Sequence, residues 1–79
     1  MDGMTEQLVT MLAERFNVAP ERIRPETHLV ADLGADSLDM VEFIMEIEER
    51  LGVTIGENEA EQLQTFGDAL ALVRTKGPS

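Results

Sequence analysis

Apolar residues recur every three or four positions along most of this chain, which is the spacing of amphipathic helices. Leu8, Leu12 and Phe16 follow it and predict a first helix over residues 6–16, with Thr5 as its N-cap. Helical periodicity dominates the rest of the chain as well. The order of apolar and polar positions therefore predicts an all-α protein.

A long segment without a sustained period follows, over residues 17–36. It contains Pro20, Pro25 and Gly34, which interrupt helices. Loops of this length in compact domains are usually functional. We expect apolar side chains scattered through the loop to fasten it to the core: Val18, Ile23, Leu29, Val30 and Leu33.

Three further helices follow this loop. The second covers residues 37–51 and ends where Gly52 can adopt the left-handed conformation of a C-cap. A short third helix is expected over residues 59–63. The fourth begins after Thr65, a capping residue, and ends near Lys76. The sequence thus predicts a small four-helix bundle, with three main helices, one short helix and a long loop between the first two.

Length limits what so small a chain can do. Its 79 residues suffice for one domain, expected over residues 1–79 with an ordered core at about 4–76 and a tail at 77–79. No apolar run is long enough to span a bilayer, and the start of the chain lacks the basic residues of a signal peptide. We expect a cytoplasmic monomer that does not bind a membrane.

Composition narrows the choice of partners. Sixteen Asp and Glu residues against six Lys and Arg give a net charge of −10, which disfavours nucleic acid and anionic lipid and favours a basic protein surface. The chain has no cysteine, which excludes disulfides, thiolate metal sites and a thiol nucleophile of its own. Any thiol must come from a cofactor.

The predicted second helix has two apolar faces. One arc faces the expected core and contains Met40, Phe43, Ile44, Ile47 and Leu51. A separate strip, spaced i, i+3, i+7, contains Leu38, Val41 and Met45 and is interleaved with glutamates. This strip is either a second buried side, as happens in small bundles, or a surface on which a partner docks.

The negative charge is concentrated around this same helix. Residues 32–61 hold ten acidic residues and one basic residue, Arg50. Such a face either keeps the protein soluble or steers a basic partner toward the apolar strip. Self-repulsion across one helix opposes folding, so solubility alone is the less complete explanation.

Ser37 stands at the start of the acidic helix. Asp36 and Asp39 have the spacing of an N-cap and an N3 acid, which would place Ser37 at N1 with a hydroxyl that capping does not need. Backbone N–H groups there favour an attached phosphate. The alternative is that Ser37 itself is the N-cap, a common role of serine.

Residues 33–39 read Leu-Gly-Ala-Asp-Ser-Leu-Asp and open an acidic helix, and this arrangement resembles the acyl carrier protein family. The resemblance covers roughly residues 4–76. It implies that a phosphopantetheinyl transferase attaches 4′-phosphopantetheine from coenzyme A to Ser37. The thiol of that arm would carry acyl groups as thioesters, so the chain would be a carrier without catalytic activity.

The resemblance also implies partners and residues that contact them. The partners are synthases, reductases and acyltransferases with basic docking patches, in fatty-acid, polyketide or specialised lipid biosynthesis. Partner-binding positions map onto Asp36, Leu38, Asp39, Val41, Glu42, Met45, Glu48 and Glu49, with a second patch at Ile55, Glu57, Ala60 and Glu61. An acyl pocket maps onto Leu29, Val30, Phe43, Ile44, Ile47, Ile55, Ala60, Leu63, Phe66, Ala69 and Leu70.

Other functions remain open on the residues alone. A peptidyl or aminoacyl carrier is disfavoured by Gly34-Ala35 and by the acidic helix, and an unmodified acidic adaptor differs only in leaving Ser37 bare. A Ser37–His28–Asp triad would need a scaffold that this short chain hardly offers. The spacing of the aspartates matches no EF-hand, so we assign no metal site.

Overall fold

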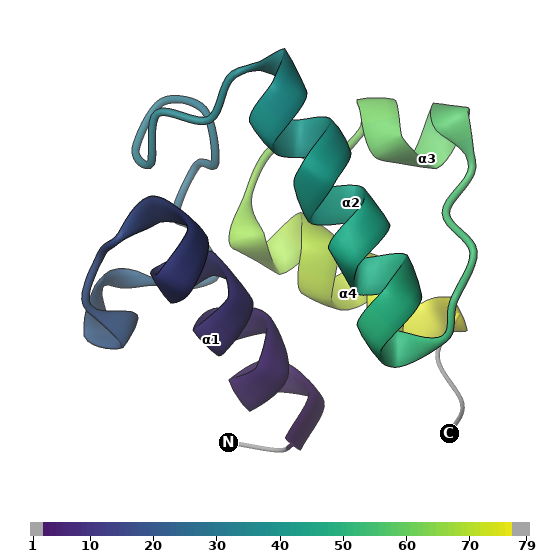
Figure 1. Cartoon of the computed structure of the whole chain (residues 1–79), viewed down its shortest axis with the longest axis horizontal. Coiled ribbons are helices and arrows are strands. Elements are labelled where there is room, and N and C mark those ends of the chain that lie inside the picture. The colour runs from purple at the N-terminus through teal and green to yellow at the C-terminus, as the bar shows by residue number, and fades with distance from the viewer. Residues whose placement is uncertain (1–2, 77–79) are drawn as a thin grey trace.

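The computed structural model describes residues 3–76 and is helical throughout its main elements (Figure 1). The elements are α1 (Gly3–Phe16), the 3₁₀ turn η1 (Pro20–Arg22), α2 (Ser37–Leu51), α3 (Glu57–Glu61) and α4 (Phe66–Lys76). The predicted all-α fold, with three longer helices and one short helix, is confirmed. The tail expected at 77–79 lies outside the described residues.

Two helix starts differ from the prediction. α1 begins at Gly3, so Thr5 lies inside the helix and is not its N-cap. α3 runs over Glu57–Glu61 instead of 59–63. The Gly56 N–H donates to the carboxylate of Glu59 at 2.9 Å, which closes the first turn of α3 two residues earlier than expected.

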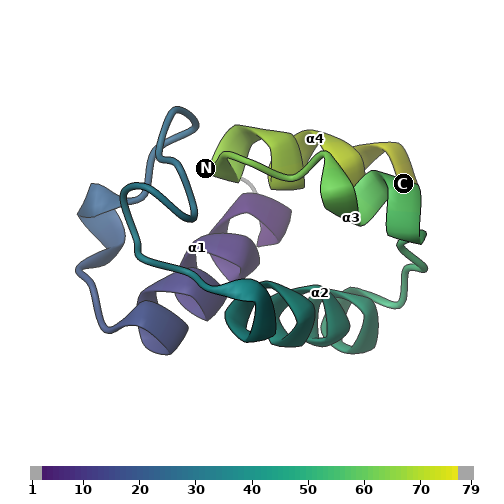
Figure 2. The ribbon, with the colours of Figure 1, turned by 90° about the horizontal axis from the view of Figure 1, so that it is seen from above.

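The helices enclose one core. Figure 2 shows α2 along one side of the molecule and α3 with α4 along the other, and α1 packs against both α2 and α4. The largest side chains removed from solvent come from every long helix and the loop: Leu8, Met11, Leu12, Leu29, Phe43, Ile47, Phe66 and Val73. Burial of these groups supplies most of the stability of so small a domain.

α4 begins with a reciprocal cap that includes Thr65, the capping residue predicted from the sequence. The Asp68 N–H donates to the Thr65 hydroxyl at 3.1 Å, and the N–H of Thr65 donates back to the Asp68 carboxylate at 3.1 Å. The N–H of Gln64 donates to the same carboxylate. These donors, Thr65 first, hold the pKa of Asp68 below its ordinary value.

The long loop is tied to this cap by backbone hydrogen bonds. His28 and Thr65 form an isolated antiparallel bridge, and the N–H of Leu29 donates to the carbonyl of Gln64 at 2.8 Å. Leu29 is thereby held in the core with no solvent exposure. The prediction that Val30 also anchors the loop is wrong, because its side chain is 51% exposed.

Gly67 marks a close backbone approach between the loop and α4. Its N–H donates to the carbonyl of Pro25 at 2.9 Å, and a Cβ at this position would lie 2.9 Å from the same oxygen. The atom that an added Cβ would meet is a backbone oxygen, which cannot move aside without moving the chain.

Gly67→Ala is therefore expected to lower the free energy of unfolding by about 1–3 kcal/mol and Tm by roughly 4–8 °C for each kcal/mol. Gly3→Ala is the matched control, because a Cβ added there would meet nothing within 4 Å and the two changes affect the unfolded chain alike. Thermal unfolding followed by circular dichroism makes the comparison. Equal Tm values for the two variants would contradict the close approach.

Candidate functional site

The turn that leads into α2 explains why Gly and Ala occupy positions 34 and 35. Gly34 has φ +77°, a left-handed conformation that residues with a Cβ rarely adopt. Its N–H donates to the carbonyl of Val30 at 2.9 Å, and the N–H of Ala35 donates to that of Leu29 at 3.1 Å. Ala35 is buried, at 3% exposure. The turn therefore delivers Asp36 to the entry of the helix in a fixed orientation.

Asp36 and Asp39 cap α2 reciprocally, as predicted. The N–H of Asp39 donates to Asp36 Oδ1 at 2.8 Å, and the N–H of Asp36 donates to Asp39 Oδ2 at 3.2 Å. Ser37 is the first residue of the helix. The alternative that Ser37 is itself the N-cap is wrong, because Asp36 fills that role.

Ser37 is exposed at this helix start, and the cap does not use its hydroxyl. A primary hydroxyl in that setting can be joined to phosphorus in a phosphodiester. The unpaired backbone N–H groups of the first turn and the helix dipole favour the phosphate, whereas Asp36 and Asp39 repel it. The residues present thus fit a phosphate-linked arm, and an enzyme that attaches it must supply cations.

The second apolar strip of α2 lies on the surface. Leu38 is 64% exposed, Val41 52% and Met45 59%. Phe43 and Ile47, on the opposite arc, are fully buried. The strip is therefore not a second core face, and α2 uses one side for packing and leaves the other to solvent.

One cation from another helix reaches the acidic face. Arg15, in the last turn of α1, places Nη1 at 3.0 Å from Glu42 Oε1 and Nη2 at 3.0 Å from Glu46 Oε1. Glu46 also accepts from Arg50 Nε at 3.1 Å. The hydrogen bond to Glu46 is the main cause that raises the pKa of Arg15. Sequence reasoning missed this contact, because 27 residues separate Arg15 from Glu42.

Two of the predicted partner-binding positions have structural roles. Ile55 is buried, at 8% exposure, which agrees with its place among the predicted acyl-pocket residues and leaves little of it for a partner to contact. Its N–H donates to the carboxylate of Glu48 at 2.8 Å. Glu48 thereby fastens the α2–α3 loop to the last turn of α2.

The remaining predicted partner-binding positions near α3 differ in how far they are buried. Glu57 and Glu61 are exposed, and Ala60 is half-buried against the core. Glu59 lies 3.0 Å from Lys76 Nζ of α4. The N–H of Gly56, and after it Lys76, lowers the pKa of Glu59. This ion pair joins α3 to the end of α4.

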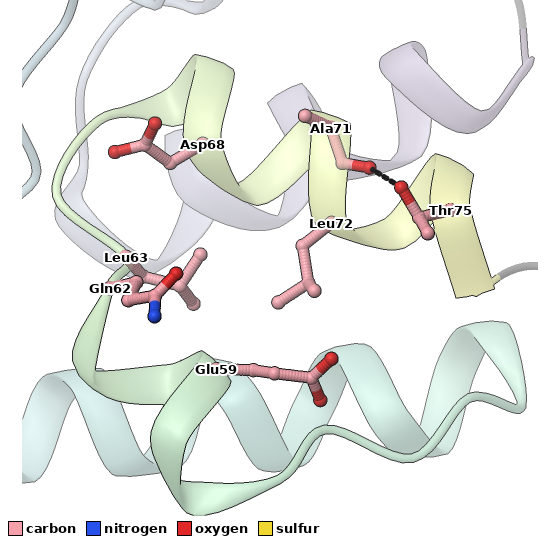
Figure 3. A pocket seen from close by; sticks show the side chains of 7 residues that line it. All are labelled: Glu59, Gln62, Leu63, Asp68, Ala71, Leu72 and Thr75. Atoms are coloured by element: carbon pink, nitrogen blue, oxygen red, sulfur yellow. Dashed lines mark hydrogen bonds between the residues drawn. The ribbon is translucent and has the colours of Figure 1, made fainter.

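Ten of the eleven predicted acyl-pocket residues lie in the core or pack against it. Val30 is the exception, as its exposure shows. A pocket of about 290 Å³ lies between α3 and α4, where Leu72 points from α4 toward Glu59 (Figure 3). Its lining residues are Glu59, Gln62, Leu63, Asp68, Ala71, Leu72 and Thr75. Only Leu63 belongs to both sets, so this pocket is not the predicted one.

The described residues contain neither a metal-binding cluster nor a membrane-spanning helix. Within residues 3–76, no three His, Asp or Glu side chains gather as metal ligands would. In the same range, no helix combines the length and apolar content needed to cross a bilayer.

Comparison with known proteins agrees with this geometry. Residues 6–73 match the family model described as a phosphopantetheine attachment site. The class is therefore a carrier domain with covalent 4′-phosphopantetheine as its cofactor. A protein from Wolinella succinogenes named acyl carrier protein is 40% identical over 70 residues, which are 89% of this chain and 92% of that protein. The chain belongs to the acyl carrier protein family, whose members are carriers and not catalysts.

The crowding of carboxylates around α2 gives a prediction about stability. Arg50 lies within residues 32–61, and Arg15 and Lys76 form ion pairs with carboxylates of this region from other segments. Three cations therefore neutralise only part of the charge of its ten carboxylates. Raising NaCl from about 0.02 M to about 0.5 M should therefore screen net repulsion and raise Tm by roughly 4–8 °C.

Thermal unfolding in MgCl₂ provides the control for this prediction. At matched ionic strength Mg²⁺ should give the same Tm as NaCl if it acts only by screening. A Tm that does not respond to either salt would show that the carboxylates do not repel one another appreciably.

Proposed function

We propose that Ser37 is the residue to which 4′-phosphopantetheine is attached, and that the arm carries acyl groups. The observation that supports this most directly is the exposed Ser37 hydroxyl at the first position of α2, left out of the cap by Asp36. The family match includes this position. When bound, the arm supplies a terminal thiol that holds the acyl group as a thioester, and the chain has no cysteine of its own.

Loading needs a separate enzyme, a phosphopantetheinyl transferase. The Ser37 oxygen forms a bond to the phosphorus of coenzyme A that bears the pantetheine, 3′,5′-ADP leaves, and the hydroxyl proton passes to the transferase or to solvent. Asp36 and Asp39 hold the helix end on which the hydroxyl stands, and Gly34 permits the turn before it. The chain presents the nucleophile, and the transferase must provide the cations that bind the diphosphate.

The partner surface is proposed on α2 and α3. Leu38, Val41 and Met45 would be buried against the partner, and the acidic side chains around them would attract its basic patch. Synthases, reductases and acyltransferases of fatty-acid or related lipid and polyketide synthesis are partners of this chemistry. A cytoplasmic location, a monomeric state and a single carrier domain over residues 1–79 remain predictions.

The acyl chain is proposed to enter among the core residues that α2, α3 and α4 share. Phe43 and Ile47 are fully buried, and Leu63 and Ile55 nearly so. A close-packed core has no ready space for a long apolar chain, so cargo must displace these side chains. The displaced contacts are replaced by contacts with the acyl chain, which is itself apolar.

The attachment residue is tested by Ser37→Ala. Incubation with coenzyme A and a phosphopantetheinyl transferase should add one phosphopantetheine group to the wild-type chain and none to the variant, as read by intact mass. The variant should keep its helical circular dichroism, because the cap does not involve the hydroxyl. Ser79→Ala changes the chain's other serine and should load fully. Loading of Ser37→Ala, or none of the wild type, would refute the assignment.

The docking strip is tested by Val41→Gln. The Val41 side chain is exposed in the free chain and would be buried in the complex. Its replacement should lower kcat/KM for loading by about five-fold, because about 1 kcal/mol of favourable burial free energy is lost. Val30→Gln is the matched control, because Val30 is almost equally exposed, at 51%, but stands on the loop. Equal kcat/KM values for the two variants would mean that the strip does not contact the transferase.

A further inference from the structure

Arg15 joins two carboxylates of the docking helix with one guanidinium. Nη1 contacts Glu42 and Nη2 contacts Glu46, each at 3.0 Å, so the fork spans one turn of α2 from the end of α1. The side chain of Arg15 is 23% exposed. The cation is therefore held in place by packing as well as by charge.

The two carboxylates differ in what else can reach them. Glu46 is 23% exposed and also binds Arg50, so two cations already surround it. Glu42 is 49% exposed, and among residues 3–76 Arg15 is the cation that pairs with it. An incoming cation can therefore approach Glu42, whereas Glu46 is shielded on both sides.

Glu42 also lies beside the exposed apolar strip of Leu38, Val41 and Met45. It follows Val41 directly and stands one turn after Leu38, and both side chains are exposed. A basic side chain that approaches the strip meets Glu42 already paired with Arg15. To bind Glu42, that side chain must share the carboxylate with Arg15 or displace it.

We propose that Arg15 competes with basic partners for Glu42 and thereby helps to determine which partners dock. The inference rests on the docking function proposed above. A partner that places a cation against Glu42 gains less binding free energy than it would gain from a carboxylate without an ion pair. A partner whose cations fall on exposed carboxylates without an ion pair among the described residues, such as Glu49 and Glu61, loses nothing.

The alternative role for Arg15 is a purely structural clamp between α1 and α2. One observation argues that the clamp is costly. The Nε–H of Arg15 is buried with no hydrogen-bond partner within residues 3–76, and a buried donor left unpaired is unfavourable. Arg15→Met keeps the apolar stem, removes this donor and the charge, and so is a suitable test variant.

A double-mutant cycle separates competition from clamping. The readout is kcat/KM for loading by a phosphopantetheinyl transferase that accepts the wild-type chain, measured at low salt. Arg15→Met should raise kcat/KM by about two- to five-fold, because Glu42 becomes available. Glu42→Gln should lower kcat/KM only slightly in the wild-type background. In the Arg15→Met background the factor by which it lowers kcat/KM should be about two to five times larger. Both effects should vanish near about 0.5 M NaCl.

Glu49→Gln supplies the matched control on the same helix. Glu49 is exposed and has no ion pair within the described residues, so its neutralisation should have the same effect in both backgrounds. Tm is measured for every variant, which separates loss of fold from loss of docking.

Three outcomes would overturn the proposal. They are additive effects of Arg15→Met and Glu42→Gln, no effect of Glu42→Gln in either background, and a fall in kcat/KM together with Tm on Arg15→Met, which would identify a clamp. If no phosphopantetheinyl transferase loads the wild-type chain, so that the cycle cannot be measured, the proposed function fails instead. The last outcome is thus distinguishable from the first three.

A second measurement needs no variant and covers failure of Arg15→Met to fold. The guanidinium NMR signals of Arg15 are followed in the wild type during titration with a hexalysine peptide. Displacement from Glu42 should shift these signals as the peptide saturates. Unchanged Arg15 signals at saturation would overturn the proposal.

Discussion

The reciprocal hydrogen bonds between Asp36 and Asp39 are the interaction on which the proposed role of Ser37 depends. They satisfy backbone donors at the start of α2 with aspartates and so release Ser37 from capping. A serine that capped the helix would point its oxygen at the backbone. Here Ser37 is instead an exposed residue at the first position of the helix, and the cap does not use its hydroxyl. The turn at Gly34 leads directly into this helix end.

Local patterns were enough to predict α2, α4 and their caps. The cap of each helix is made by residues three apart, such as Thr65 and Asp68, and this spacing is visible in the sequence. Helix-wheel reasoning likewise placed Phe43 and Val41 on different faces, but it left open whether the face of Val41 was buried, and the structure shows that it is exposed. These features depend on neighbours within one turn, which is the range over which sequence patterns are informative.

Contacts between distant segments could not be predicted in this way. Arg15 pairs with Glu42 across 27 residues, and no local spacing signals it. Ile55 was placed both in the second partner patch and in the acyl pocket, and the structure buries its side chain while its N–H binds Glu48. Val30 was expected in the core together with Leu29, but of the two only Leu29 is buried, next to the bridge between His28 and Thr65. These outcomes depend on contacts beyond one helical turn, which local spacing and hydrophobicity do not reveal.

The acidic face of α2 is consequently less uniform than its composition suggests. Glu48 binds a backbone N–H, Glu42 and Glu46 share Arg15, and Asp36 and Asp39 bind each other's backbone. A carboxylate already engaged in the folded chain offers a partner less than an unengaged one, because the existing contact must be given up first. The net charge sets how strongly a basic protein is attracted from a distance. If α2 is the docking surface proposed above, the carboxylates that are already engaged within the chain are the harder ones for a basic partner to bind, and the unengaged ones are the easier.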